Sequence, residues 1–279
     1  MSLKTLLSVI VDVDSARPQI EAAATLARRH DAHLDILALG IDEVQVGYYF
    51  AGADTVLQET SMAMAREAAE ARRKAADEVA EAEGVRFTTQ AAVAQIGVLN
   101  DVVAQAARFA DLVIVPQPYG AGAPADAEAV LEAALFAGTA PTLVLPQAGL
   151  PDGFPRRAVI GWNEGTEALR AVRGALPLLR DCTTTTVAIV APPMRGPEQG
   201  EPGQRLCTML DRHEVRAEIS LLPKAMPRIA DILSRQVTDL DADLLVAGAY
   251  GHSRFREALL GGATRDLLAH ATVPLLMAH

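Results

Sequence analysis

The feature of this 279-residue chain that most constrains its fold is an internal repeat. The segment ADLVIVPQPYG at 110–120 recurs as ADLLVAGAYG at 242–251, and the apolar ends TAPTLVLP and TVPLLMAH follow the two copies at similar spacing. The openings also match, since LLSVIVDVDSARPQIEAAATLARRH at 6–30 parallels RRAVIGWNEGTEALRAVRGALPLLR at 156–180. In both, an apolar strand enters a helix through a turn at Asp14 or Asn163. A repeat of this kind predicts two copies of one domain.

The join between the repeats is the segment QAGLPDGFP at 147–155, whose two prolines and two glycines are typical of a linker. We therefore predict domains over 1–146 and 156–279. The length of the chain is sufficient for two domains, each with its own core.

Within each repeat, apolar runs alternate with helical patterns. Runs such as DLVIV and DLLVA are continuous in Val, Ile and Leu, as expected for parallel strands buried on both faces. The alternation predicts the α/β class, with two tandem doubly wound sheets of five parallel strands each. Strands are expected near 4–12, 33–39, 86–92, 111–116, 141–145, 157–162, 185–191, 216–222, 243–248 and 273–277. Helices are expected near 16–30, 56–83, 97–109, 127–137, 165–180, 203–213, 226–239 and 261–270.

Charge and composition exclude several classes of function. The net charge is −10, and all of the excess lies in residues 1–150, with 10 basic and 20 acidic residues, whereas 151–279 hold 15 of each. Without a basic stripe we expect no nucleic-acid partner, although backbone amides can still bind a small anion. No apolar run is long enough for a membrane span, so we expect no membrane partner. Two cysteines are too few for a disulfide framework, and we expect a cytoplasmic protein.

A glycine pattern after the fourth strand of the second repeat indicates a binding loop. In open α/β sheets ligands bind at the carboxyl ends of the strands, where glycines allow close approach and amides at a helix N-terminus point at an anion. The alternative is that these glycines only form turns and helix caps. His252 and Arg254, next to the loop, are candidates for a phosphate contact or for solvated surface roles. The candidate loop residues are Gly248, Gly251, His252, Arg254, Gly261, Gly262, Ala263 and Thr264.

Other chemical signatures are missing from the sequence. It has no Walker loop, no G-x-G-x-x-G fingerprint after a first strand, and no G-x-S-x-G nucleophile elbow. The histidines lack the paired spacing of metal ligands, so we expect no metal site. We predict no catalytic residue.

The segment GAYGHSRFREALLGGATRDLLAHATVPLLMAH at 248–279 resembles the C-terminal signature of the universal stress protein family, whose nucleotide-binding members carry G-x2-G-x9-G-[ST]. With the repeat, the chain is similar to the tandem members over almost its whole length. The resemblance implies five-stranded parallel sheets in the order 3-2-1-4-5. It also implies that adenine and ribose lie over the ends of strands one, two and four, and that the glycine motif wraps the phosphates.

Residue by residue, the resemblance implies that Gly248 and Gly251 line ribose and phosphates, and that the segment 261–264 holds phosphate oxygens through Gly261, Gly262 and Thr264. Asn163 takes the place of an aspartate at the end of strand one, and Val190 or Ala191 lies near the adenine. Gly262 stands where the motif has Ser or Thr, so that the hydroxyl contact is lost unless Thr264 replaces it. The implied cofactor is ATP or another adenine nucleotide, with or without Mg²⁺.

The first repeat departs further from the motif. Only Gly120 matches the glycine positions, and Glu128 and Glu132 lie where a phosphate would approach and be repelled. We predict that this half binds no nucleotide and serves as a structural partner of the other half.

Each repeat ends in an apolar strand at the edge of its sheet, and exposed apolar edges favour pairing. In the family such last strands pair between subunits. We therefore expect the two last strands to pair within the chain, as a pseudo-twofold unit that can form a homodimer.

Three hypotheses of function follow from the sequence. The first is a cytoplasmic stress-response regulator that binds an adenine nucleotide in its second half. The second is a nucleotide-independent interaction protein, a scaffold whose protein partner the sequence does not name. The third is a weak ATPase in which His252 or Asp243 activates water.

Overall fold

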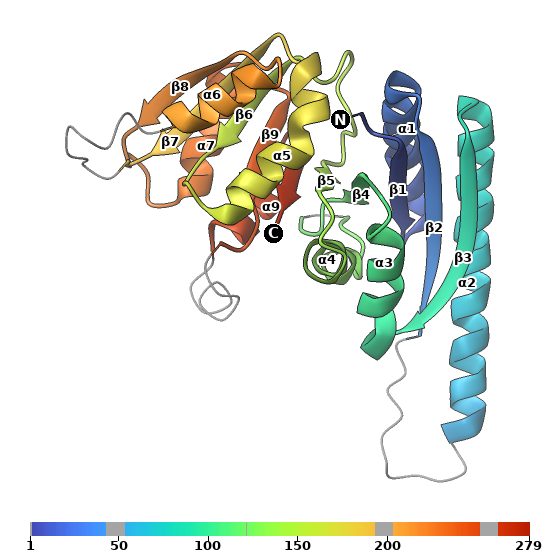
Figure 1. Cartoon of the computed structure of the whole chain (residues 1–279). Helices are drawn as coiled ribbons and strands as arrows, with labels where there is room; N and C mark the ends of the chain where they lie inside the picture. Colours follow the sequence, from blue (N-terminus) through green and yellow to red (C-terminus); the bar gives the residue numbers. More distant parts are fainter. Residues whose placement is uncertain (1, 43–53, 121, 193–202, 252–261) are drawn as a thin grey trace. The chain divides into compact units, whose positions relative to one another are not determined.

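The computed structural model describes residues 2–42, 54–120, 122–192, 203–251 and 262–279, and the side chains of 54–57 lie outside that description (Figure 1). Its contacts divide the chain into two compact units. The N-terminal unit comprises residues 2–118 and 122–140, and the C-terminal unit comprises residues 119–121 and 141–279. The predicted domain boundary at 147–155 is not tested by this division and stays a prediction.

The strands lie where the apolar runs predicted them, and the α/β class is confirmed. Most strands are almost completely buried, as parallel strands covered on both faces should be. The strands are β1 (Thr5–Ile10), β2 (His33–Asp42), β3 (Phe87–Gln95), β4 (Leu112–Pro116), β5 (Thr142–Leu145), β6 (Arg157–Gly161), β7 (Thr184–Val190), β8 (Ala217–Leu222), β9 (Leu244–Gly248) and β10 (Leu275–Ala278).

The N-terminal unit has the strand order β3-β2-β1-β4, all parallel. This agrees with the first four strands of the predicted order. On one face α1 (Val13–His30) packs against α2 (Asp54–Glu83), and α3 (Leu99–Ala107) lies on the other face together with α4 (Ala127–Glu132) (Figure 1). The 3₁₀ turn η1 (Ile96–Val98) precedes α3, and the π-helical turn η2 (Ala133–Ala137) continues α4.

The C-terminal unit has the order β5-β10-β9-β6-β7-β8. Strands β8-β7-β6-β9-β10 are parallel and have the predicted order 3-2-1-4-5. Strand β5, from the first repeat, pairs antiparallel with β10, with Val144 opposite Leu275. The two last strands therefore pair within the chain, as their apolar edges predicted. The pseudo-twofold relation and a homodimer stay predictions.

The helices of the C-terminal unit are α5 (Thr166–Asp181), α6 (Gln204–Arg212), α7 (Ile229–Asp239) and α9 (Ala263–His270). Each lies within or close to a predicted range. In the N-terminal unit the predicted turn at Asp14 is wrong by two residues, because Asp12 caps α1 and accepts a hydrogen bond from the Ser15 amide at 2.9 Å. Within the described part of the chain, no helix is long and apolar enough to cross a membrane.

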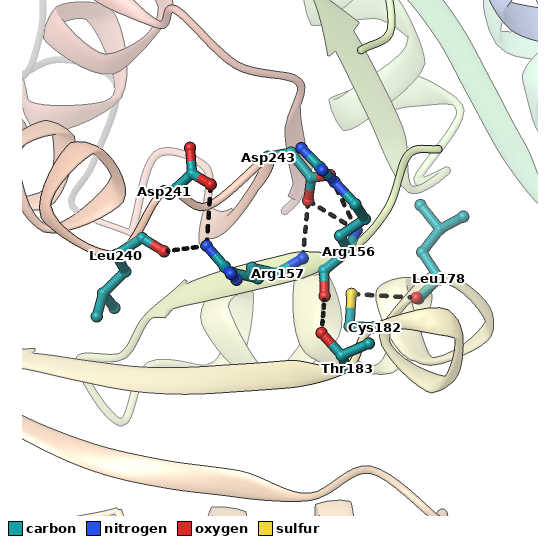
Figure 2. A network of polar contacts seen from close by, with 8 residues as sticks. All are labelled: Arg156, Arg157, Leu178, Cys182, Thr183, Leu240, Asp241 and Asp243. Carbon is teal, nitrogen blue, oxygen red and sulfur yellow. Dashed lines mark hydrogen bonds and ion pairs between the residues drawn. The ribbon is translucent and has the colours of Figure 1, made fainter. Parts of the chain in front are cut away.

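The repeated aspartates have a structural role at the amino ends of the strands. Asp243, buried just before β9, accepts hydrogen bonds from the Arg156 amide at 2.8 and 2.9 Å and from the Arg157 amide at 2.9 Å (Figure 2). Asp111, just before β4, accepts from the amides of Lys4 at 2.7 Å and Thr5 at 3.0 Å. In each unit this carboxylate joins the start of strand four to the start of strand one.

We predict that Asp243→Asn destabilises the C-terminal unit by about 2–3 kcal/mol, because a buried carboxylate that accepts several N–H groups is replaced by an amide that presents donors to them. Urea unfolding followed by the fluorescence of Trp162, the one tryptophan of the chain, measures the change. The matched variant is Asp111→Asn, where the side chain is exposed and the loss should be smaller. Equal unfolding midpoints for wild type and Asp243→Asn would contradict this role.

Candidate functional site

The carboxyl ends of β6, β7 and β9 form one edge of the C-terminal sheet. Gly161, the last residue of β6, pairs with Ala188 of β7 on one side and Ala247 of β9 on the other. The loops that follow these three strands therefore begin side by side. This is the edge at which open α/β sheets bind their ligands.

The backbone is strained in each of the three loops. Glu164 after β6, Ala191 after β7 and Tyr250 after β9 have φ values of 63°, 47° and 54°. The left-handed region costs a residue with a Cβ roughly 1–2 kcal/mol, and such residues gather at functional sites. Among the described residues of the loops after β1 and β4, only Gly120 and Gly122 have a positive φ, and glycine carries no such cost.

Asn163 turns the chain from β6 into α5. Its side-chain oxygen accepts a hydrogen bond from the Gly165 amide at 2.8 Å, and its amide nitrogen donates to Oε1 of Glu167 at 3.1 Å. Glu167 lies in the first turn of α5, where a negative charge is favoured by the helix dipole. Asn163 thus fixes both the turn and the position of the Glu167 carboxylate.

Three glycines surround that carboxylate. A Cβ on Gly165 would lie 2.0 Å from Oε1 of Glu167, and one on Gly251 would lie 2.2 Å from the same atom. A Cβ on Gly248 would lie 2.5 Å from Cγ of Glu167 and 2.6 Å from the Ala168 amide nitrogen. We call the space in front of Gly165, Gly248 and Gly251 the glycine space. It exists because these three residues have no side chain, and the Glu167 side chain fills it, with its carboxylate in front of Gly165 and Gly251.

The loop after β9 is tied to neighbouring segments. The Ala249 amide donates to the Ala278 carbonyl at 2.9 Å, and Nδ1 of His279 lies 3.0 Å from the Ala249 carbonyl oxygen. The Tyr250 amide donates to Oγ1 of Thr264 at 2.9 Å. Because Thr264 is buried in the first turn of α9, its hydroxyl oxygen joins the start of this helix to the glycine loop.

The remaining predicted residues are placed as follows. Val190 ends β7 opposite Leu222, and the Ala191 amide donates to the Leu222 carbonyl at 2.8 Å. Gly262 caps α9, which begins at Ala263. The structure thus brings Asn163, Gly248 and Gly251 together through Glu167, and Thr264 to them through Tyr250. The predicted contacts of His252, Arg254 and Gly261 lie outside the described residues.

Sequence reasoning missed Glu167 and Gly165. A signal was present, because Asn163 and Glu167 are four residues apart around a helix start, where an acidic side chain is favourable. The contact with Gly248 and Gly251 had no local signal, since some 80 residues separate them from Glu167 in the sequence.

The interpretation of Asp243 as the base of a weak ATPase is wrong. Its carboxylate lies at the amino end of β9 and accepts hydrogen bonds from Arg156 and Arg157 (Figure 2). The glycine space lies at the carboxyl end of β9. Among the residues described, no group of three or more His, Cys, Asp and Glu side chains is arranged to hold a metal ion.

The corresponding edge of the N-terminal unit is built differently. The Arg72 guanidinium, from α2, donates to the Leu39 carbonyl and is attracted by the carboxylates of Asp12 and Asp126. Burial lowers the pKa of Arg72 below its ordinary value despite these two charges. The predicted phosphate-repelling residues Glu128 and Glu132 lie in α4. That this half binds no nucleotide stays a prediction.

Known proteins resemble the chain in sequence and in fold. Residues 155–279, which contain the glycine space, match the model of the Universal stress protein family. Among curated proteins, none matches the chain.

Two solved structures share the fold over almost the whole chain. A universal stress protein from Archaeoglobus fulgidus DSM 4304 is 12% identical with a TM-score of 0.65, over 98% of this chain and 95% of that protein. A putative universal stress protein from Pseudomonas aeruginosa UCBPP-PA14 is 16% identical with a TM-score of 0.50, over 98% and 92%. The universal stress protein from Archaeoglobus fulgidus in complex with dAMP is 14% identical with a TM-score of 0.27, over 51% of this chain and 96% of that protein.

We predict that Thr264→Val lowers stability by about 1–2 kcal/mol, because the isosteric side chain leaves the Tyr250 amide without its acceptor. The melting temperature should fall by roughly 2–8 °C. Thr208→Val is the matched control, since the exposed Thr208 hydroxyl only donates to the Gln204 carbonyl within its own helix. An equal loss of stability in the two variants would contradict a stabilising role for the hydrogen bond between Tyr250 and Thr264.

Proposed function

We propose that this chain, whose residues 155–279 match the Universal stress protein family, binds an adenine nucleotide at the carboxyl edge of its C-terminal sheet. The observation that carries the proposal is the glycine space. Gly165, Gly248 and Gly251 leave room for an anionic group between two loops, and a carboxylate of the protein itself fits there. A phosphate is also a small oxyanion, and backbone next to glycine can approach it closely.

Two further features of the edge support an anion site. The helices α5 and α9 both begin here, and the amides of their first turns carry a partial positive charge. The strained loop residues Glu164, Ala191 and Tyr250 indicate that the loop shapes are maintained at a cost in stability. Both features lie in the second half of the chain, whose net charge of zero does not repel an anion as the acidic first half would.

In this proposal the ligand is ATP or another adenine nucleotide, with or without Mg²⁺. The protein is a cytoplasmic stress-response regulator rather than an efficient enzyme. Its output is then a change in the binding of a protein partner.

One observation favours a second function, that of a nucleotide-independent interaction protein. The glycine space is filled by Glu167, so the glycines already have a structural reason to lack side chains. In that case both units are scaffolds. Gly262, which stands where the family motif has Ser or Thr, then needs no hydroxyl group because there is no phosphate to contact.

Titration calorimetry in the presence of Mg²⁺ distinguishes the two functions. We predict binding of at least one of ATP, AMP and cyclic AMP to the intact chain, and a loss of about tenfold or more in affinity for Gly251→Ala, whose added Cβ enters the glycine space. The matched control is Gly97→Ala, where a Cβ meets no atom within 4 Å. Absence of binding by the wild type, together with purified protein that carries no nucleotide, would favour the scaffold.

A further inference from the structure

We propose that Glu167 determines which ligands the site accepts, by selecting against negative charge at the glycine space. The inference rests on the proposed function, because it concerns the ligand of that same site. It makes Glu167 a specificity-determining residue that the glycine motif does not contain.

The Glu167 carboxylate and a phosphate compete for the same space. Oε1 of Glu167 is so close to Gly165 and Gly251 that a single added carbon atom on either would collide with it. A phosphate group is larger than a carbon atom. A phosphate and the Glu167 carboxylate therefore cannot both occupy the glycine space.

Asn163 holds the Glu167 carboxylate in place. The Nδ2 group of Asn163 donates to its carboxylate at 3.1 Å, while Oδ1 of the same residue is engaged by the Gly165 amide at 2.8 Å. An aspartate at 163 would bring a second negative charge to this point, whereas asparagine offers a donor. Asn163 and Glu167 act as a pair, in which the carboxylate sits in the helix and the amide at the strand end.

The negative charge of Glu167 also acts against a phosphate. In the part of the chain that the structure describes, Glu167 forms no ion pair with lysine, arginine or histidine. Among the described residues, its negative charge is met by the Asn163 amide group and by the start of α5. Moving the side chain aside leaves this charge next to an incoming phosphate, where two charges a few ångströms apart repel each other by about 1 kcal/mol even in water.

The consequence is an order of affinity. Without a divalent cation, the wild type should bind adenosine more tightly than AMP, and AMP more tightly than ATP. A carboxylate is also a good acceptor for sugar hydroxyls, which a nucleoside offers and a phosphate does not. Mg²⁺ neutralises part of the ligand charge and should reduce the difference.

Calorimetry with adenosine, AMP and ATP in a chelating buffer tests this order. The variant is Glu167→Gln, which keeps the shape of the side chain and removes its charge. We expect its affinity for ATP to rise by about tenfold, with adenosine changed by no more than about threefold. The control is Glu214→Gln, which changes the net charge equally in the exposed loop before β8, at the opposite edge of the sheet.

The outcomes separate the two proposals. Equal ATP affinities for wild type and Glu167→Gln, or an equal gain in Glu214→Gln, would overturn the role of Glu167 and leave the proposed function standing. A gain in Glu167→Ala without one in Glu167→Gln would also overturn it, because space and not charge would then be limiting. If none of the three ligands binds to any variant, with or without Mg²⁺, both proposals fail.

Discussion

The C-terminal site depends on one steric constraint, the lack of side chains on Gly165, Gly248 and Gly251. A Cβ on Gly248 would collide with the backbone at the start of α5, and one on Gly165 or Gly251 would displace the Glu167 carboxylate. Asn163 and Thr264 then fix the two loops, one through the turn into α5 and the other through the Tyr250 amide. The resulting space holds one anionic group. If that group is a phosphate of a ligand, the site binds nucleotide. If it is always the Glu167 carboxylate, the protein is a scaffold.

The two repeats use equivalent positions in different ways. Asp111 and Asp243 join the starts of strands one and four in both units, which explains why the aspartate is part of the repeat. At the opposite edge, the N-terminal unit has Asp12 capping α1 and Arg72 facing carboxylates, whereas the C-terminal unit has Asn163, glycines and strained loop residues. The shared features maintain the fold, and the differing features lie where ligands bind.

The sequence predicted the fold well because its strands are continuous apolar runs whose order the repeat made visible. Strand lengths were less predictable. β2 extends to Asp42 and β3 to Gln95 because these residues pair with each other, a contact that no local pattern contains. Likewise, α4 gives way to a π-helical turn at Ala133, inside a range predicted as one helix.

At the site, the glycine pattern and Asn163 were visible in the sequence, since turns and close approaches have local signatures. Glu167 was not, because its carboxylate is brought to Gly248 and Gly251 by the pairing of β6 with β9. Side-chain occupancy of a shared space is a tertiary property. For this reason Gly248 and Gly251 predict a phosphate-binding loop from the sequence, whereas in the structure the Glu167 side chain lies against them.

The most direct test of the central claim, that one space admits one anion, is a crystal structure of the chain with AMP and Mg²⁺. The account predicts that phosphate oxygens lie in front of Gly165 and Gly251 only when the Glu167 side chain has turned out of that space and lost its contact with Asn163. A structure with phosphate on these glycines and Glu167 still hydrogen-bonded to Asn163 would contradict it.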